Sequence, residues 1–221
     1  MFKVLLTKKL SASDLDLIRS WGWNVDTEET LNIIPVEVKE ILTAEAWIVS
    51  SRNSINAIKK FVDQSPGTIY CVGNWMKEEL LMTGTKSVIW SFDNMKKLVT
   101  HLAGQNFKSI LYFCGEEHRH ELEEGLKDSS VKISKVITHK SQMMFPIIKK
   151  TFDAVFAFSP RSAESLLRNN SFNTQTVFAC IGSTTASYLN TRGITNTFVA
   201  SYPDSRILLE EFHAQILNFK S

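Results

Sequence analysis

Short runs of apolar, often β-branched residues alternate along the chain with stretches in which apolar residues recur every three or four positions. The runs predict ten β-strands: Lys3–Thr7, Leu31–Pro35, Ala46–Ser50, Thr68–Val72, Ser87–Trp90, Ser109–Cys114, Lys132–Ile137, Asp153–Phe158, Thr176–Ile181 and Thr197–Ala200. The periodic stretches predict helices: Ser13–Trp21, with Ser13 as its N-cap, and Ile55–Val62, Met76–Leu81, Met95–Leu102, Leu122–Leu126 and Leu208–Phe219. Strands that alternate with helices are typical of parallel α/β sheets, and two five-stranded sheets suit this length better than one of ten.

An internal repeat supports the division into two sheets. The segment Ala46–Arg52 resembles Ala154–Pro160, and their serines, Ser51 and Ser159, are 108 residues apart. Three further pairs are each 109 residues apart: Cys71 and Cys180, Gly73 and Gly182, and Gly84 and Gly193. Landmarks at one nearly constant offset indicate two related α/β units.

The repeat also predicts how the chain is divided between the units. The second copy begins near Asp153 and contributes only three strands, so it needs the two N-terminal strands to complete a sheet of five. We therefore expect a discontinuous first domain, residues 1–36 plus 143–221, and an inserted second domain, residues 43–137. Residues 37–42 and 138–142 are the expected linkers.

Composition bounds the partners and the compartment. There are 25 Lys and Arg residues against 23 Asp and Glu, a net charge of +2 that does not favour nucleic acid. The first nine residues hold only a short apolar run before two lysines, and no long segment is apolar throughout, so we expect neither a signal peptide nor a membrane span. The three cysteines are too few and too dispersed for a disulfide framework, which favours a folded, soluble protein of the cytoplasm.

The loops that follow the predicted strands share one chemistry. They are rich in small hydroxyl residues, glycines and scattered Lys or Arg: Thr7–Lys9, Ser50–Ser54, Gly73–Asn74, Gly115–Arg119, Ser159–Ser162 and Gly182–Thr185. In doubly wound sheets such loops lead into helix N-termini, where backbone N–H groups favour carboxylates and phosphates. In any single loop these residues more often serve as helix caps or tight turns. Six such loops in two domains favour an anionic ligand between the domains.

Other candidates for chemistry are weaker. The segment Gly182–Thr185 lacks the lysine of a P-loop, and no GxGxxG follows the first strand, so a nucleotide is not supported. His118 and His120 are expected to be solvated rather than bound to a metal. The cysteines are expected to be buried hydrophobic residues. The residues alone thus predict an anion-binding, cofactor-free protein of two domains.

The order and spacing of five short motifs resemble one enzyme family. The motifs are Ser50-Ser51-Arg52-Asn53, Val72-Gly73-Asn74, Gly115 with Arg119 and Leu122, Phe158-Ser159-Pro160, and Ile181-Gly182-Ser183-Thr184-Thr185-Ala186. Together they resemble the uroporphyrinogen-III synthase family over nearly the whole chain.

The resemblance implies a fold and a reaction. The fold would be α/β, with two flavodoxin-like doubly wound parallel-sheet domains, the second inserted into the first and joined to it by a two-stranded linker. The enzyme would be a cofactor-free, metal-free hydro-lyase of heme biosynthesis and a monomer. It would cyclise hydroxymethylbilane, an octacarboxylate linear tetrapyrrole, to uroporphyrinogen III with loss of water and inversion of ring D. Because the substrate closes unaided to the uninverted isomer, the enzyme must direct which bond forms.

The resemblance also implies the site residues. The catalytic set is His139, Thr184 and Thr185. The substrate-binding set is Thr7, Lys8, Ser51, Arg52, Asn53, Gly73, Asn74, Gly115, Arg119, Ser159, Pro160, Gly182 and Ser183. Met76 stands where many relatives have threonine, and His139 stands in place of a tyrosine proposed as a proton donor. An imidazole can donate a proton near neutral pH, although a solvent-exposed linker residue is an equal interpretation of His139.

Two other classes of function remain open from the sequence. A non-catalytic homologue could hold a tetrapyrrole or another polyanion without turnover, and Met76 and His139 are the residues that favour it. A two-domain sensor for sugars or phosphates is disfavoured because we expect no secretion signal.

Overall fold

The chain forms two compact α/β units. The computed structural model describes residues 1–220, and their side chains as far as residue 217. Unit 1 comprises Met1–Asn32 and Gln142–Ser221, and unit 2 comprises Ile33–Ser141. The chain therefore enters and leaves unit 2 once each, and both ends of the chain belong to unit 1.

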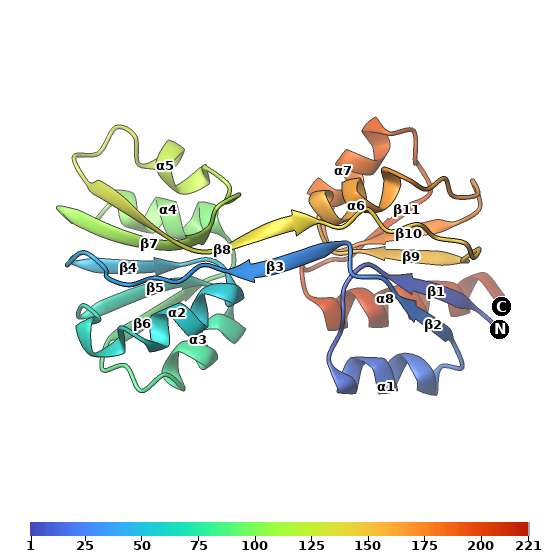
Figure 1. Ribbon diagram of the computed structural model, residues 1–221, viewed down its shortest axis with the longest axis horizontal. Helices are drawn as coiled ribbons and strands as arrows, with labels where there is room; N and C mark the ends of the chain where they lie inside the picture. The colour runs from blue at the N-terminus through green and yellow to red at the C-terminus, as the bar shows by residue number, and fades with distance from the viewer. Residues whose placement is uncertain (221) are drawn as a thin grey trace. The chain divides into compact units, whose positions relative to one another are not determined.

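Unit 1 is built on a five-stranded parallel sheet of order β11-β10-β9-β1-β2. Its strands are β1 (Lys3–Leu6), β2 (Asn24–Thr27), β9 (Ala154–Ala157), β10 (Val177–Cys180) and β11 (Thr197–Val199). Helices α1 (Ala12–Ser20) and α8 (Ser205–Lys220) cover one face, and α6 (Pro160–Leu167) and α7 (Ser183–Thr191) cover the other (Figure 1). Apolar side chains from both faces of the strands fill two core layers, as expected for a buried parallel sheet.

Unit 2 is built on a six-stranded sheet of order β3-β8-β7-β4-β5-β6. Its strands are β3 (Leu31–Pro35), β4 (Ala46–Val49), β5 (Thr68–Val72), β6 (Val88–Phe92), β7 (Ser109–Gly115) and β8 (Lys132–Met143). Helices α2 (Ile55–Lys59) and α3 (Asn74–Leu81) cover one face, and α4 (Met95–Ala103) and α5 (Glu121–Gly125) cover the other (Figure 1). Two short 3-10 turns, Arg52–Ser54 and Val62–Gln64, flank α2.

The two sheets share one strand order, which matches the internal repeat. In each unit the first strand of the repeat, β4 or β9, is central, and the next two follow it toward one edge. On the other side of the central strand lie β7 and β8 in unit 2, and β1 and β2 in unit 1. The carboxyl ends of these parallel strands meet at one edge within each unit, and the predicted loops lie there.

The strand that completes the sheet of unit 1 differs from the prediction. The sequence predicts Leu31–Pro35 for this role, whereas Asn24–Thr27 fills it and Leu31–Pro35 lies in the six-stranded sheet. The strand β2 pairs on one side only and none of its residues is buried, so it needs no apolar run. Without that run the pattern of alternation gives no signal.

Three local boundaries also differ from the prediction. The strand β8 continues to Met143, so the expected linker 138–142 is extended strand. Helices α6 and α7 are absent from the predicted set, because they are short and rich in serine and threonine. The N-cap of α1 is Ser11 rather than Ser13, and its Oγ accepts a hydrogen bond of 3.1 Å from the backbone N–H of Asp14.

None of the helices in the described part of the chain is long and apolar enough to cross a membrane.

Candidate functional site

His139 is positioned by a break in the pairing of β7 with β8. Cys114 pairs with Ile137 and Gly115 pairs with His139, so Thr138 has no partner residue on β7. Such β-bulges redirect side chains and are common beside active sites. His139 is 8% exposed, which excludes the interpretation of this residue as a solvent-exposed linker residue.

A chain of hydroxyl groups fixes the orientation of the imidazole. The Thr138 hydroxyl donates to the carbonyl oxygen of Cys114 at 3.1 Å. It also lies 2.9 Å from Ser54 Oγ and 2.8 Å from His139 Nδ1. Because Thr138 has one hydroxyl proton, it must accept from both of these groups, and Nδ1 therefore carries the ring proton. The lone pair of Nε2 then faces Ser51 Oγ, 3.4 Å away.

The surroundings of His139 favour the neutral imidazole. Burial lowers the pKa of His139 below its ordinary value, and the negative charge of Glu117 opposes this only in part. At neutral pH the ring therefore offers an unprotonated Nε2. This geometry supports a proton acceptor at Nε2 better than the proton donor that the resemblance implies.

The lowered pKa predicts how stability depends on pH. The unfolded chain binds a proton at His139 near pH 6.5, whereas the folded protein binds it only at lower pH. The contribution is therefore complete above pH 6.5 and is lost as the pH falls through the folded value. Urea unfolding at pH 7.5 and pH 5 should show a smaller loss of stability for His139→Gln than for the parent protein. His101→Gln, outside this network, is the matched control, and an unchanged pH dependence in His139→Gln would contradict the account.

Gly115 makes room for the imidazole. A Cβ atom at Gly115 would lie 2.7 Å from His139 Nε2, closer than real Cβ contacts allow. We expect Gly115→Ala to displace the ring and to lower turnover about tenfold, within the usual contribution of a general acid or base. Gly67→Ala is the matched control, because its Cβ would meet nothing within 4 Å. Steady-state turnover of the two variants checks this, and equal turnover would show that the ring does not need this position.

Unit 1 repeats the hydroxyl pair without the histidine. Thr30 Oγ1 lies 2.6 Å from Ser162 Oγ and 3.0 Å from the carbonyl oxygen of Thr7. Thr30 precedes Thr138, and Ser54 precedes Ser162, by the 108 residues of the repeat. Leu31 follows Thr30 where His139 follows Thr138. A pair present in both units supports the sheet, whereas an imidazole in only one unit is a candidate for function.

The other predicted residues of unit 2 lie on the loops at the same edge. Ser51 caps the 3-10 turn, since its Oγ accepts from the N–H of Asn53 at 3.3 Å. The guanidinium of Arg52 lies over the ring of Trp75, 4.6 Å from the ring centre. Gly73 begins α3 at a φ of +90°, a conformation that requires glycine, and no side chain caps that helix.

Three more predicted positions of unit 2 carry specific contacts. Asn74 Oδ1 accepts a hydrogen bond of 2.9 Å from Ser91 Oγ. Arg119 is exposed and lies 3.6 Å from a carboxylate oxygen of Glu121. Met76 is buried and packs in the core of unit 2, so this position is structural here.

In unit 1 the residues after β1 and β9 mostly support the fold. Thr7 is 1% exposed and its hydroxyl donates to the carbonyl oxygen of Phe156 at 2.8 Å, so its side chain stabilises the pairing of β1 with β9 instead of facing a ligand. Lys8 Nζ lies 2.9 Å from Ser205 Oγ and 4.3 Å from the centre of the Phe158 ring. Ser159 caps α6 by accepting from the N–H of Ser162 at 3.0 Å, and Pro160 is at the start of that helix.

The start of α7 separates the predicted threonines. Gly182 is the N-cap and offers no capping side chain, and Ser183 and Thr184 are exposed. Thr185 is fully buried and its Oγ1 has no hydrogen-bond partner, so its hydroxyl cannot reach a ligand in this structure. This corrects the expectation that both threonines contact a ligand. The spacing of Thr-Thr at a helix start could not show which hydroxyl faces inward.

His118 is not a solvated residue, contrary to the sequence-based expectation. Its side chain is 7% exposed, and Nε2 lies 2.7 Å from Oε1 of Glu123. Burial works against ionisation of Glu123, but the hydrogen bond from His118 and the charges of His118 and Lys135 outweigh it and lower the pKa of this carboxyl. The two residues are five positions apart across the start of α5, where a motif search does not pair them.

The fold and these loops define a class of two-unit parallel α/β proteins with polar, anion-directed strand ends. The family model for uroporphyrinogen-III synthase HemD matches residues 16–210, and the chain belongs to that family. A comparison with curated proteins finds no match.

Two solved structures of the same description resemble this fold. Uroporphyrinogen-III synthetase from Helicobacter pylori has a TM-score of 0.70 at 15% identity, with 97% of this chain and 100% of that one covered. A mutant uroporphyrinogen III synthase from Thermus thermophilus has a TM-score of 0.67 at 13% identity, with 99% and 100% covered. At these identities the likeness shows a shared mixed α/β fold with parallel sheets.

Proposed function

We propose that this protein is a uroporphyrinogen-III synthase, a lyase that converts hydroxymethylbilane to uroporphyrinogen III with loss of water and inversion of ring D. The observation that carries the proposal is the family match over residues 16–210, which spans both units. The reaction needs neither metal nor organic cofactor in this proposal.

We further propose that both units are flavodoxin-like domains, the second inserted into the first. Numbered along the chain, the strands of unit 1 run 5-4-3-1-2 across the sheet, which is the flavodoxin order 2-1-3-4-5 read from the other edge. The same order, circularly permuted, describes β4 to β8 of unit 2. We retain 37–42 and 138–142 as the linkers between domain 1, residues 1–36 and 143–221, and domain 2, residues 43–137.

The substrate is proposed to bind through its carboxylates to polar groups at the strand ends. In unit 1 these groups are Ser183, Thr184 and Lys8, with Gly182 leaving the start of α7 without a side-chain cap. In unit 2 they are Arg52, Asn53, Asn74 and Arg119, with Gly73 in the matching position on α3. Helix N-termini and basic side chains both favour carboxylates.

His139 is the proposed catalytic residue. Loss of water on ring closure removes a hydroxyl from one end of the bilane and a proton from the pyrrole carbon that forms the new bond. A neutral imidazole with an unprotonated Nε2 suits the removal of that proton. Thr138 and Ser54 would act as positioning residues that hold the required tautomer.

The setting of the reaction is also part of the proposal. The net charge of +2 does not favour nucleic acid as a partner, and the three cysteines are free and buried, which suits a reduced compartment. We propose a monomer that acts in the cytoplasm on a small-molecule substrate.

Generating hydroxymethylbilane in situ tests this function. The products are oxidised and resolved into the type I and type III isomers. The proposal expects type III above the control without protein. A non-catalytic tetrapyrrole-binding homologue would instead bind the bilane and leave type I as the only product.

A further inference from the structure

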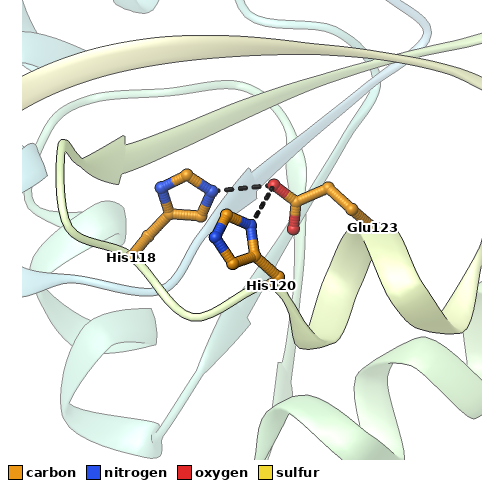
Figure 2. A group of neighbouring side chains, drawn as sticks. All are labelled: His118, His120 and Glu123. Carbon is orange, nitrogen blue, oxygen red and sulfur yellow. Dashed lines mark hydrogen bonds and ion pairs between the residues drawn. The ribbon is translucent and has the colours of Figure 1, made fainter.

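A second cluster of potential ligands lies outside the proposed reaction site, at the start of α5. His118, His120 and Glu123 each direct one ligand atom toward the others, and all three atoms lie within 4.8 Å of one another (Figure 2). His118 Nε2 is 2.7 Å and His120 Nδ1 is 3.7 Å from the same oxygen, Glu123 Oε1. Ligand atoms of a tetrahedral zinc ion are about 3.3 Å apart, so these separations bracket the required spacing.

Two further contacts prepare the cluster for a metal. Nδ1 of His118 lies 3.1 Å from the carbonyl oxygen of Gly115, which can only accept, so Nδ1 carries the proton and Nε2 is the ligand atom. This support of a ligating histidine by a carbonyl is usual in metal sites and fixes the ring orientation. The second carboxylate oxygen of Glu123, Oε2, is buried without a hydrogen-bond partner. A cation held between the histidines and this carboxylate would satisfy it.

We propose that His118, His120 and Glu123 form a binding site for a divalent transition metal, with Zn²⁺ as the ion that the ligand set suits best. Two imidazoles and one carboxylate match the three protein ligands of zinc sites that keep a fourth position open. The metal replaces the proton between His118 Nε2 and Glu123, and that proton passes to solvent. The fourth position is open to water or to the carboxylate of a ligand.

The site would act as a clip on the segment between β7 and α5. His118 and His120 lie in that segment and Glu123 lies on the helix, so one ion would tie the segment to the helix. The segment also carries Gly115, whose Cα faces His139. The proposal rests on the ligand geometry and does not depend on the proposed reaction.

Lys135 gives the proposal a signed prediction. Its Nζ lies 3.5 Å from Glu123 Oε1, so its ammonium group competes with a divalent cation for the same oxygen. Removing that charge in Lys135→Met should tighten metal binding. Adventitious binding at scattered exposed histidines would not respond to this substitution.

The test is a titration of the metal-free protein with Zn²⁺ in competition with a chromophoric chelator, and with Co²⁺ as a spectroscopic probe. We expect one equivalent to bind and tetrahedral Co²⁺ bands to appear. His120→Ala and Glu123→Gln should each weaken binding at least ~tenfold, as much as the loss of a supporting contact does. His101→Ala is the matched control and should bind as the parent protein does.

His120 provides the informative variant because its side chain is 66% exposed, so its loss leaves the fold intact, whereas His118→Ala opens a buried position. Circular dichroism verifies folding of each variant. Absence of stoichiometric Zn²⁺ binding would overturn the proposal. Equal affinity of His120→Ala, Glu123→Gln and the parent protein would overturn it as well.

Discussion

His139→Phe should lower kcat at saturating substrate by about 10² or more, the usual contribution of a positioned general acid or base. Phenylalanine fills the space of the imidazole but offers no lone pair at the position of Nε2. The KM should change much less, because the ring is 8% exposed and contributes little surface to binding. Steady-state rates of type III isomer formation measure both parameters.

Thr138→Val separates the chemistry of His139 from its structural support. Valine keeps the shape of the side chain but removes the acceptor that lies 2.8 Å from His139 Nδ1. The imidazole then loses the contact that fixes its tautomer, so kcat should fall and the pH profile of kcat should shift. The matched control is Thr30→Val, which removes the corresponding hydroxyl of unit 1, where Leu31 takes the place of the histidine. If His139→Phe kept the parent kcat, the assignment of a catalytic role would be wrong.

The adjacent threonines of α7 should respond to the same substitution in opposite ways. Thr184→Val removes an exposed hydroxyl from the proposed carboxylate site and should raise KM by about tenfold to a hundredfold, the range for a hydrogen bond to a charged group. Thr185→Val removes a buried hydroxyl without a partner and should raise the stability by about 1 kcal/mol or more, with KM unchanged. Substrate titrations and urea unfolding of both variants check the pair.

Thr176→Val supplies the control for a buried hydroxyl that is satisfied. Thr176 is 5% exposed and its hydroxyl donates to the carbonyl oxygen of Phe152 at 2.8 Å. Its removal leaves that carbonyl without this donor and should destabilise unit 1. A rise in KM for Thr185→Val with no change for Thr184→Val would reverse our assignment of the ligand-facing hydroxyl.

The fold was predictable from sequence where the strands are buried on both faces. Strands such as β4 and β9 read as continuous apolar runs, and their repeat at a constant offset indicates two related units. The edge strand β2 was not predictable, because Asn24, Asp26 and Thr27 give it no apolar run. The helix α7 was missed for a related reason, since its start is a polar run from Ser183 to Thr185.

The candidate site was predictable as a set of loops but not as a geometry. The motifs place Ser51, Gly115 and His139 near the ends of strands, yet only the bulge in β8 shows that they meet. The repeat also held an unread signal, because Thr30 and Thr138 are separated by the same 108 residues as Ser54 and Ser162. The metal-ligand cluster escaped prediction because the orientation of Glu123 toward His118 depends on where α5 begins.

The isomer composition formed from hydroxymethylbilane tests the central claim most directly. The parent protein, His139→Phe and a control without protein would be compared at the same bilane supply, with folding of each protein verified. Our account predicts mostly type III isomer from the parent protein and a shift toward type I with His139→Phe, as spontaneous closure overtakes the slowed enzyme. Type I alone from the folded parent protein would contradict the proposed synthase activity.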